Sequence, residues 1–183
     1  MKTLTFAAGI ALMALPLVPA QAGILTIGEG FARSCYEYSE SHIATPAAIE
    51  ACNRAFSEQA LDRRDEVATH VNRGILYYLS GNLSAANADY DRALALDASQ
   101  PEAWLNKGMA ALKARNSSAA APMFEKALQL KTVRPALAYY GRAIVHEDSG
   151  NVRQAYADLQ RARELEPRWP LPGEELKRYV VRN

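Results

Sequence analysis

The chain has 183 residues, of which 21 are lysine or arginine and 20 are aspartate or glutamate, so its formal net charge is +1. This near-neutral balance gives no support for a nucleic acid or another polyanion as the partner. The length is sufficient for one domain with its own hydrophobic core.

Residues 1–22 have the features of an export signal. Lys2 precedes an apolar stretch over residues 4–19, and residues 20–22, Ala-Gln-Ala, form a small-x-small site of the kind that a signal peptidase cleaves. A membrane anchor is the alternative, but it would need about 18 uninterrupted apolar residues, and Pro16 breaks the stretch. We therefore expect residues 1–22 to be removed, no membrane span to remain, and the protein to be periplasmic or secreted.

Residues 23–66 contain both cysteines of the chain, Cys35 and Cys52. An exported chain meets an oxidising environment, so we expect these two residues to form a structural disulfide. A metal site is less favoured, because the chain has no Cys-x-x-Cys and no second pair of ligands at zinc spacing. Thr45-Pro46 is a helix N-cap followed by proline at the first helical position.

An internal repeat organises residues 67–169. Shifting the sequence by 34 residues places Gly74 on Gly108, and a further shift of 35 places both on Ala143. Small, large, aromatic and turn positions coincide together, which chance alignment does not produce. The other columns are Ala86, Ala120 and Ala155; Tyr90, Phe124 and Leu159; Ala93, Ala127 and Ala162; His70, Trp104 and Tyr139; and Asn82, Asn116 and Asn151.

Each repeat is predicted to form two antiparallel helices. The first carries a ring and a small residue one turn apart, as in Trp104 and Gly108, and the second carries small residues seven apart around a large one, as in Ala86, Tyr90 and Ala93. Small residues at a helix crossing let the two backbones approach closely, and the ring fills the space beside the contact. The small columns should therefore be contact points between helices.

The pattern Trp-x-x-x-Gly, then Ala-x-x-x-Phe, then Ala-Leu, over residues 104–128, resembles the tetratricopeptide repeat (TPR) family. The resemblance implies an all-α fold, a TPR-like α-solenoid of antiparallel helical hairpins, with repeats at 67–100, 101–135 and 136–169. Pro122 falls early in a second helix and is tolerated without cost only within the first turn.

The segments on either side of the repeats are expected to close the ends of the solenoid. Residues 23–66 should form a degenerate hairpin that carries the cysteine pair, with residues 63–66, Arg-Arg-Asp-Glu, as a charged connector. Counting back on the repeat frame places Cys35 on the core side, facing Cys52. Residues 170–183 should form a C-terminal capping helix over the last repeat.

The sequence has no arrangement typical of catalysis. Gly28-x-Gly30 lacks the third glycine of a phosphate-binding loop, and His42, His70 and His146 are widely spaced with no His-Glu-x-x-His. We expect no enzymatic activity, no metal and no cofactor.

The TPR resemblance implies that the first helices line a concave groove. Family members that clamp a terminal carboxylate use Lys and Asn at the fifth and ninth positions of each unit, and this chain has apolar or aromatic residues there, so that kind of clamp is not expected. The expected partner-binding residues are Val71, Ile75, Tyr78, Leu79, Leu105, Met109, Leu112, Leu137, Tyr140 and Ile144.

Two functions fit this groove. One is a non-enzymatic adaptor that binds an apolar helix or an extended peptide of a protein partner. The other is a structural or self-associating module, possible as a homo-oligomer, whose groove is covered by its own segments or by another copy, since a long exposed apolar groove would be a sticky surface.

Overall fold

The computed structural model describes residues 30–179 and shows nine α-helices and no strand in that range. The expected export signal lies outside the described residues. Within them, no helix is both long and apolar enough to cross a membrane. The helices are α1 Phe31–Glu40, α2 Pro46–Glu58, α3 Arg63–Leu79, α4 Leu83–Leu96, α5 Pro101–Lys113, α6 Ser117–Gln129, α7 Pro135–Asp148, α8 Val152–Leu165 and α9 Pro170–Leu176.

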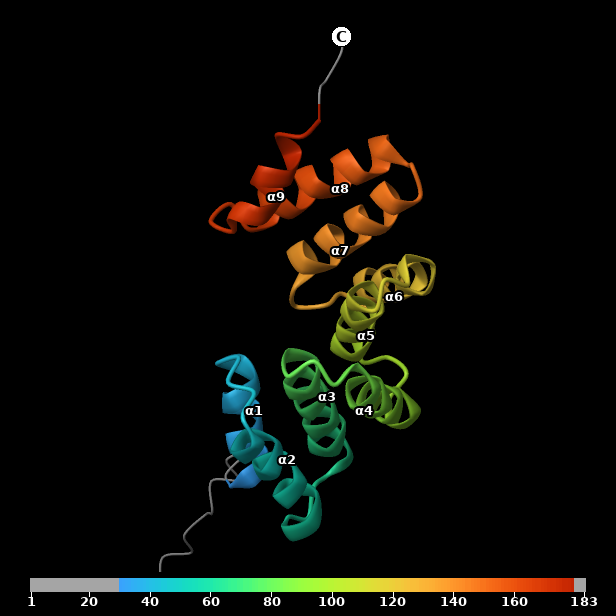
Figure 1. Ribbon diagram of the computed structural model, residues 1–183. Coiled ribbons are helices and arrows are strands. Elements are labelled where there is room, and N and C mark those ends of the chain that lie inside the picture. The colour runs from blue at the N-terminus through green and yellow to red at the C-terminus, as the bar shows by residue number, and fades with distance from the viewer. Residues whose placement is uncertain (1–29, 180–183) are drawn as a thin grey trace, which may run out of the picture.

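Consecutive helices pair into hairpins that stack side by side (Figure 1). The pairs are α1 with α2, α3 with α4, α5 with α6, and α7 with α8, and the short helix α9 packs on α8. The first helices of successive hairpins also contact one another, α1 with α3, α3 with α5, and α5 with α7. This arrangement confirms the predicted all-α solenoid with a C-terminal capping helix.

Local sequence signals explain where the helices begin and end. The Thr45 side chain accepts a hydrogen bond from the Ala48 N–H, and Pro46 is the first residue of α2, as the sequence indicates. Gly81 and Gly150 adopt positive φ angles of 85° and 74°, which end α3 and α7 and turn the chain into the following helix. Glycine supplies this backbone conformation without steric cost.

The charged residues 63–66 are not a connector, and that prediction is wrong. They form the first turn of α3, and the Asp62 side chain caps this helix by accepting a hydrogen bond from the Asp65 N–H. Asp65 and Glu66 lie at the helix N-terminus, where negative charge is favourable because of the helix dipole. The charge run therefore marks the start of a helix.

Pro122 is the sixth residue of α6, beyond the first turn where it would be tolerated without cost. Its missing N–H leaves the carbonyl of Ser118, four residues earlier, without the usual helical partner. Both residues are exposed, so water can satisfy that carbonyl and the helix continues to Gln129.

The small and large residues of the repeat columns lie in the interior. Every repeat-packing residue predicted from the sequence is buried except Trp104 and Tyr139, which are half-buried. The Trp104 indole N–H donates to the Ala98 carbonyl at 2.9 Å, so this ring also ties the end of one repeat to the next.

Glycine is required where a ring of the second helix meets the first helix. A Cβ on Gly74 would lie 2.4 Å from Cε1 of Tyr90, and a Cβ on Gly108 would lie 2.9 Å from Cε1 of Phe124. Gly141, which the repeat columns did not single out, faces the same ring from the next repeat: its Cβ would lie 2.4 Å from Cζ of Phe124. The Phe124 ring is thus enclosed by two glycines of successive repeats.

We predict that Gly141→Ala destabilises the protein although alanine favours helix. The added methyl group would collide with the fully buried Phe124 ring, and such overpacking costs about 1–3 kcal/mol, more than the roughly 1 kcal/mol gained in helix propensity. The free energy of unfolding in urea tests this. Gly173→Ala in α9 is the control, since its nearest neighbour would be the Arg163 side chain at 3.9 Å. Equal stability of the Gly141 variant and the parent would contradict the prediction.

Candidate functional site

The first helices enclose a cavity of about 420 Å³, here called the N-terminal chamber. Helix α1 forms one wall, α3 and α5 form the floor, and the loop between α6 and α7 forms the opposite wall. A smaller cavity of about 370 Å³ between α1 and α3 shares Tyr36, Ala68 and Asn72 with it, so the hollow continues along α3. The chamber is lined by Tyr36, Glu40, Ala68, Val71, Asn72, Ile75, Gln100, Glu102, Asn106, Val133 and Arg134.

Glu102 positions the α6–α7 loop at the edge of the chamber. Its carboxylate accepts hydrogen bonds from the Thr132 hydroxyl and from the Val133 N–H, each at 2.8 Å. This leaves the Val133 side chain 81% exposed beside the cavity.

An ion pair joins the two walls of the chamber. Nη2 of Arg134, at the start of α7, lies 3.1 Å from Oε1 of Glu40, at the end of α1. The two side chains are 41% and 46% exposed, so the pair contributes at most about 1 kcal/mol and can open at little cost.

Two asparagines from successive repeats line the floor. Asn72 and Asn106 are 34 residues apart and occupy the same position of α3 and α5. Oδ1 of Asn72 lies 3.1 Å from Oγ of Ser39 in α1, and Nδ2 of Asn106 donates to the Glu102 carbonyl at 2.8 Å. Each amide thus has a fixed orientation, and an amide can both donate and accept hydrogen bonds.

The expected groove residues separate into two classes by repeat position. Ile75, Met109 and Ile144, at the ninth position, are half-buried and line openings on this face. Val71 and Leu105, at the fifth position, are buried, because that position faces the neighbouring first helix. Val71 still borders the chamber, whereas Leu105 has no exposed surface and its assignment to the groove is wrong.

The other expected groove residues are divided between a second opening, the core and the C-terminal cap. Tyr78, Met109, Leu112 and Ile144 line an opening of about 470 Å³ between α3, α5 and α7. Leu137 packs against the core around Phe124, and Leu79 is half-buried.

The C-terminal segment covers the far end of this face. The Trp169 ring lies 4.9 Å from the Tyr140 ring, and Leu176 of α9 is buried with Ala143 and Leu159. The Tyr179 ring contacts Tyr156 at 5.6 Å between centroids. Tyr140 is therefore partly covered by the chain itself, and it lines a smaller opening of about 200 Å³ between α7, α8 and α9.

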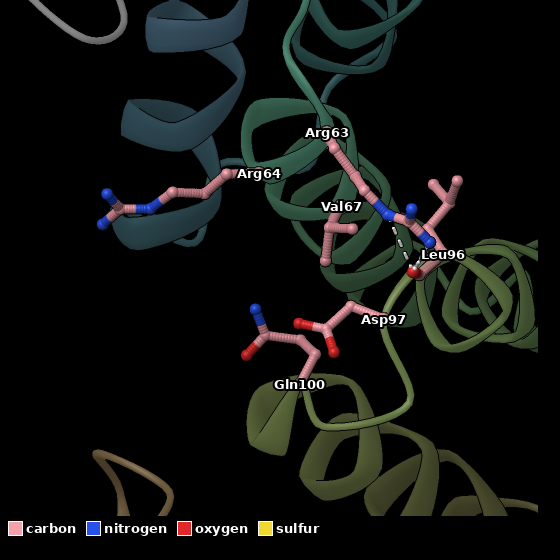
Figure 2. Close-up of a pocket in the computed structure, with 6 residues that line it drawn as sticks. All are labelled: Arg63, Arg64, Val67, Leu96, Asp97 and Gln100. Carbon is pink, nitrogen blue, oxygen red and sulfur yellow. Dashed lines mark hydrogen bonds between the residues drawn. The ribbon is translucent and has the colours of Figure 1, made fainter.

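A further cavity of about 460 Å³ lies at the N-terminal end of α3 (Figure 2). Nε of Arg63 donates to the Leu96 carbonyl at 3.0 Å, whereas Arg64 points away from the other labelled side chains. The Asp97 carboxylate accepts hydrogen bonds from the Ser99 hydroxyl and N–H, and these hold the pKa of Asp97 below its ordinary value. Arg63 and Asp97 therefore stabilise the turn between α4 and α5 through these hydrogen bonds.

A buried ionic network joins α2, α3 and α4. Arg73 makes two hydrogen bonds to the Asp89 carboxylate, at 2.7 and 2.8 Å, and a third to Oδ1 of Asn53. Nδ1 of His70 lies 2.9 Å from Asp89, and its ring lies 4.4 Å from the Phe56 ring. Burial would raise the pKa of Asp89, but the hydrogen bonds from Arg73 and His70 outweigh it and hold the pKa below its ordinary value.

The same pair recurs two repeats later. Nε and Nη2 of Arg142 donate to Asp158 at 2.7 and 2.8 Å, and His146 lies 3.7 Å from the same carboxylate. His70 and His146 thus belong to structural contacts within hairpins. In the part of the chain that the structure describes, no group of three or more His, Cys, Asp or Glu side chains is placed to hold a metal ion.

A sequence profile of the tetratricopeptide repeat family matches residues 71–135 and 105–170, more than half of the chain. The chain belongs to the tetratricopeptide repeat family. The TPR fold is typically a non-enzymatic scaffold for contacts between proteins. No curated protein matches the chain significantly.

Solved TPR structures share the fold at low sequence identity. The crystal structure of MamA has a TM-score of 0.61 and 20% identity, covering 78% of this chain and 80% of MamA. The Arabidopsis OM64 TPR domain has a TM-score of 0.58 and 20% sequence identity, and the match covers 65% of this chain and 100% of that domain. A chain of the APC/C hetero-tetramer Cut9-Hcn1 has a TM-score of 0.64 and 20% sequence identity, and the match covers 80% of this chain and 27% of that one.

The sequence did not single out most of the chamber's polar lining. Asn72 and Asn106 could have been found, because they share one column of the repeat alignment. Glu40, Val133 and Arg134 could not, since they meet only through the curvature of the stacked hairpins and through the Glu102 contact.

We predict that Asp89→Asn lowers the free energy of unfolding at neutral pH by about 3–5 kcal/mol, because it leaves the Arg73 charge partly buried without its partner. The pKa of Asp89 is lowered in the folded state, so its stabilisation is fully present above the unfolded value of about 3.9. The stabilisation is lost as the pH falls through the folded value. Denaturation at several pH values should show the difference between parent and variant shrinking in acid.

Asp91→Asn, in the same helix, is the control for this prediction. Asp91 pairs with Lys107 but is largely exposed, so its loss should cost less than about 1 kcal/mol. If the free energies of unfolding of the parent and of Asp89→Asn differed by the same amount at all pH values, the lowered pKa of Asp89 would be contradicted.

Proposed function

We propose that the protein is a non-enzymatic interaction module that binds an extended peptide segment of a partner protein in the N-terminal chamber. The observation that carries this proposal is the exposed apolar side chain of Val133, held by Glu102 beside Ile75 and Val71 at the chamber's edge. An apolar side chain of a partner would bury this surface and gain roughly 25 cal/mol for each Å² removed from water.

The polar lining of the chamber favours an extended segment over a helix. The amides of Asn72 and Asn106 suit such a ligand, because an extended main chain presents free N–H and C=O groups to side-chain donors and acceptors.

We predict that Val133→Glu weakens peptide binding at least tenfold without unfolding the protein. The change places a charge where an apolar side chain of the ligand would be buried, and 1.4 kcal/mol corresponds to a factor of ten in affinity. Peptides can be selected from a random display library with the parent protein, and their affinities then measured for both proteins. Helical content by circular dichroism should be unchanged, since Val133 is exposed.

Val152→Glu is the matched control, because this valine is 55% exposed at the start of α8 and does not line the chamber. It should bind the selected peptides as the parent does. A library that yields no peptide, or peptides that bind the Val133 variant as well as the parent, would exclude the chamber as the binding site.

The alternative of a self-covered or self-associating module has support only at the C-terminal end. There Trp169 and α9 cover Tyr140, Ala143 and Leu159 within the same chain. Sedimentation analysis separates the two functions. A monomer that binds selected peptides supports the adaptor, whereas a dimer that loses peptide binding as it forms supports self-association.

We also propose that the protein is exported to the periplasm or secreted. The support is the leader-like composition of residues 1–22 together with the cysteine pair, because disulfides persist in oxidising compartments. We predict that the protein isolated from its native source begins at Gly23, as intact-mass and N-terminal peptide measurements would show. Recovery of the uncleaved chain from the cytosol would contradict export.

A further inference from the structure

Helix α1 has a weak apolar anchor. Among its ten residues only Cys35 and Ser39 are buried, whereas α3 buries six residues and α2 buries four. The Tyr36 side chain is 50% exposed and lines the chamber. Hydrophobic burial therefore contributes less to the docking of α1 than to that of the helices around it.

The other contacts of α1 are polar or partly exposed. The Ala32 N–H donates to Oε1 of Gln59 at 2.7 Å, and the Arg54 guanidinium lies 3.8 Å from the centre of the Phe31 ring. The Ser39 contact with Asn72 and the Glu40–Arg134 ion pair complete the set that faces the chamber. Contacts of these kinds each contribute modestly in water.

The disulfide between Cys35 and Cys52 is the strong connection. It joins α1 to α2 with a Cα–Cα distance of 4.8 Å, and both cysteines are fully buried. Closing a loop of this length by a covalent bond shifts the equilibrium toward the docked state by roughly a hundredfold.

Helix α2 packs on α1 through Ala48 and Cys52, but it also has contacts of its own with α3. It is attached to α3 through the hydrogen bond between Arg73 and Asn53 and through the contact of the Phe56 and His70 rings. Repeat proteins are stabilised mainly by contacts between neighbours, so loss of a terminal helix leaves the remaining stack folded. Undocking of α1 would therefore remove one wall of the chamber without unfolding the repeats.

We infer that formation of the Cys35–Cys52 disulfide completes the N-terminal chamber, so that the site is assembled only in the oxidised protein. The two thiols lose two protons and two electrons to form the bond, and a disulfide oxidant, such as oxidised glutathione or a disulfide-exchange protein, is reduced to two thiols. The oxidised state supplies the wall that carries Tyr36 and Glu40. That a peptide binds in the chamber rests on the proposed function. Assembly of the chamber by the disulfide does not depend on that function.

Burial of the two cysteines makes the docked, oxidised state resistant to reduction. Since neither cysteine has exposed surface, a reductant cannot reach the sulfur atoms while α1 is docked. The bond therefore forms as α1 docks during folding and then persists, so the chamber would stay incomplete in a reducing compartment and become permanent in an oxidising one.

Hydrogen exchange followed by mass spectrometry tests this on the full chain. We expect Cys35→Ser/Cys52→Ser to raise the exchange rate of residues 31–40 by on the order of a hundredfold, while α3 to α8 keep the protection of the parent. Parent protein refolded in dithiothreitol should behave as the double variant does, which excludes an effect of the serine side chains.

Ser39→Ala is the matched control, because it removes the contact with Asn72 but keeps the disulfide; it should change exchange of α1 by only a few-fold. Undiminished protection of α1 in the double variant would overturn the inference, and so would loss of protection throughout α3 to α8, which would make α1 part of one cooperative unit. Peptide binding is measured separately. If no peptide binds even the oxidised parent, the proposed function fails while the exchange result still decides how the chamber is assembled.

Discussion

The structure depends on the close approach of two helix backbones at residues with little or no side chain. The aromatic side chain of each second helix in the first two repeats packs against a glycine of its own first helix, and Phe124 also meets Gly141 of the following repeat. One ring therefore fixes both the spacing within a hairpin and the spacing between hairpins. The direction of each first helix, and with it the residues that reach the concave face, follows from this contact.

The same geometry decides which side chains are available to a partner. Residues at the fifth position of a repeat, such as Val71 and Leu105, face the neighbouring first helix and are buried between repeats. Residues at the ninth position, such as Ile75 and Met109, lie one turn further along and border the hollow face. An apolar residue on a first helix is thus no evidence of a binding surface until its position within the repeat is known.

The repeat pattern was sufficient to predict the hairpins and their stacking, because columns such as Ala86, Tyr90 and Ala93 report contacts that recur at fixed sequence spacing. It was insufficient for features that depend on contacts between distant segments. The ion pair between Glu40 and Arg134 joins opposite walls of the chamber through residues that are 94 positions apart, and Trp169, at the end of the last repeat, packs on Tyr140. The charged residues 63–66 were misassigned because a run of charges is typical both of a connector and of the first turn of a helix.

The N-terminal hairpin shows how a covalent bond can take the place of the ring-on-glycine contact. Ala48, Cys52 and Ala55 of α2 are fully buried and have the spacing of Ala86, Tyr90 and Ala93 in α4, so Cys52 occupies the position of the aromatic ring.

Cys35 of α1 faces Cys52, and the disulfide holds the two backbones together without a bulky side chain between them. A ring packed on glycine holds whenever apolar surface is buried, but a disulfide holds only after oxidation. The hairpin at this end of the solenoid thus has a chemical requirement that the three following hairpins do not share, and it is the hairpin whose first helix forms the wall of the chamber.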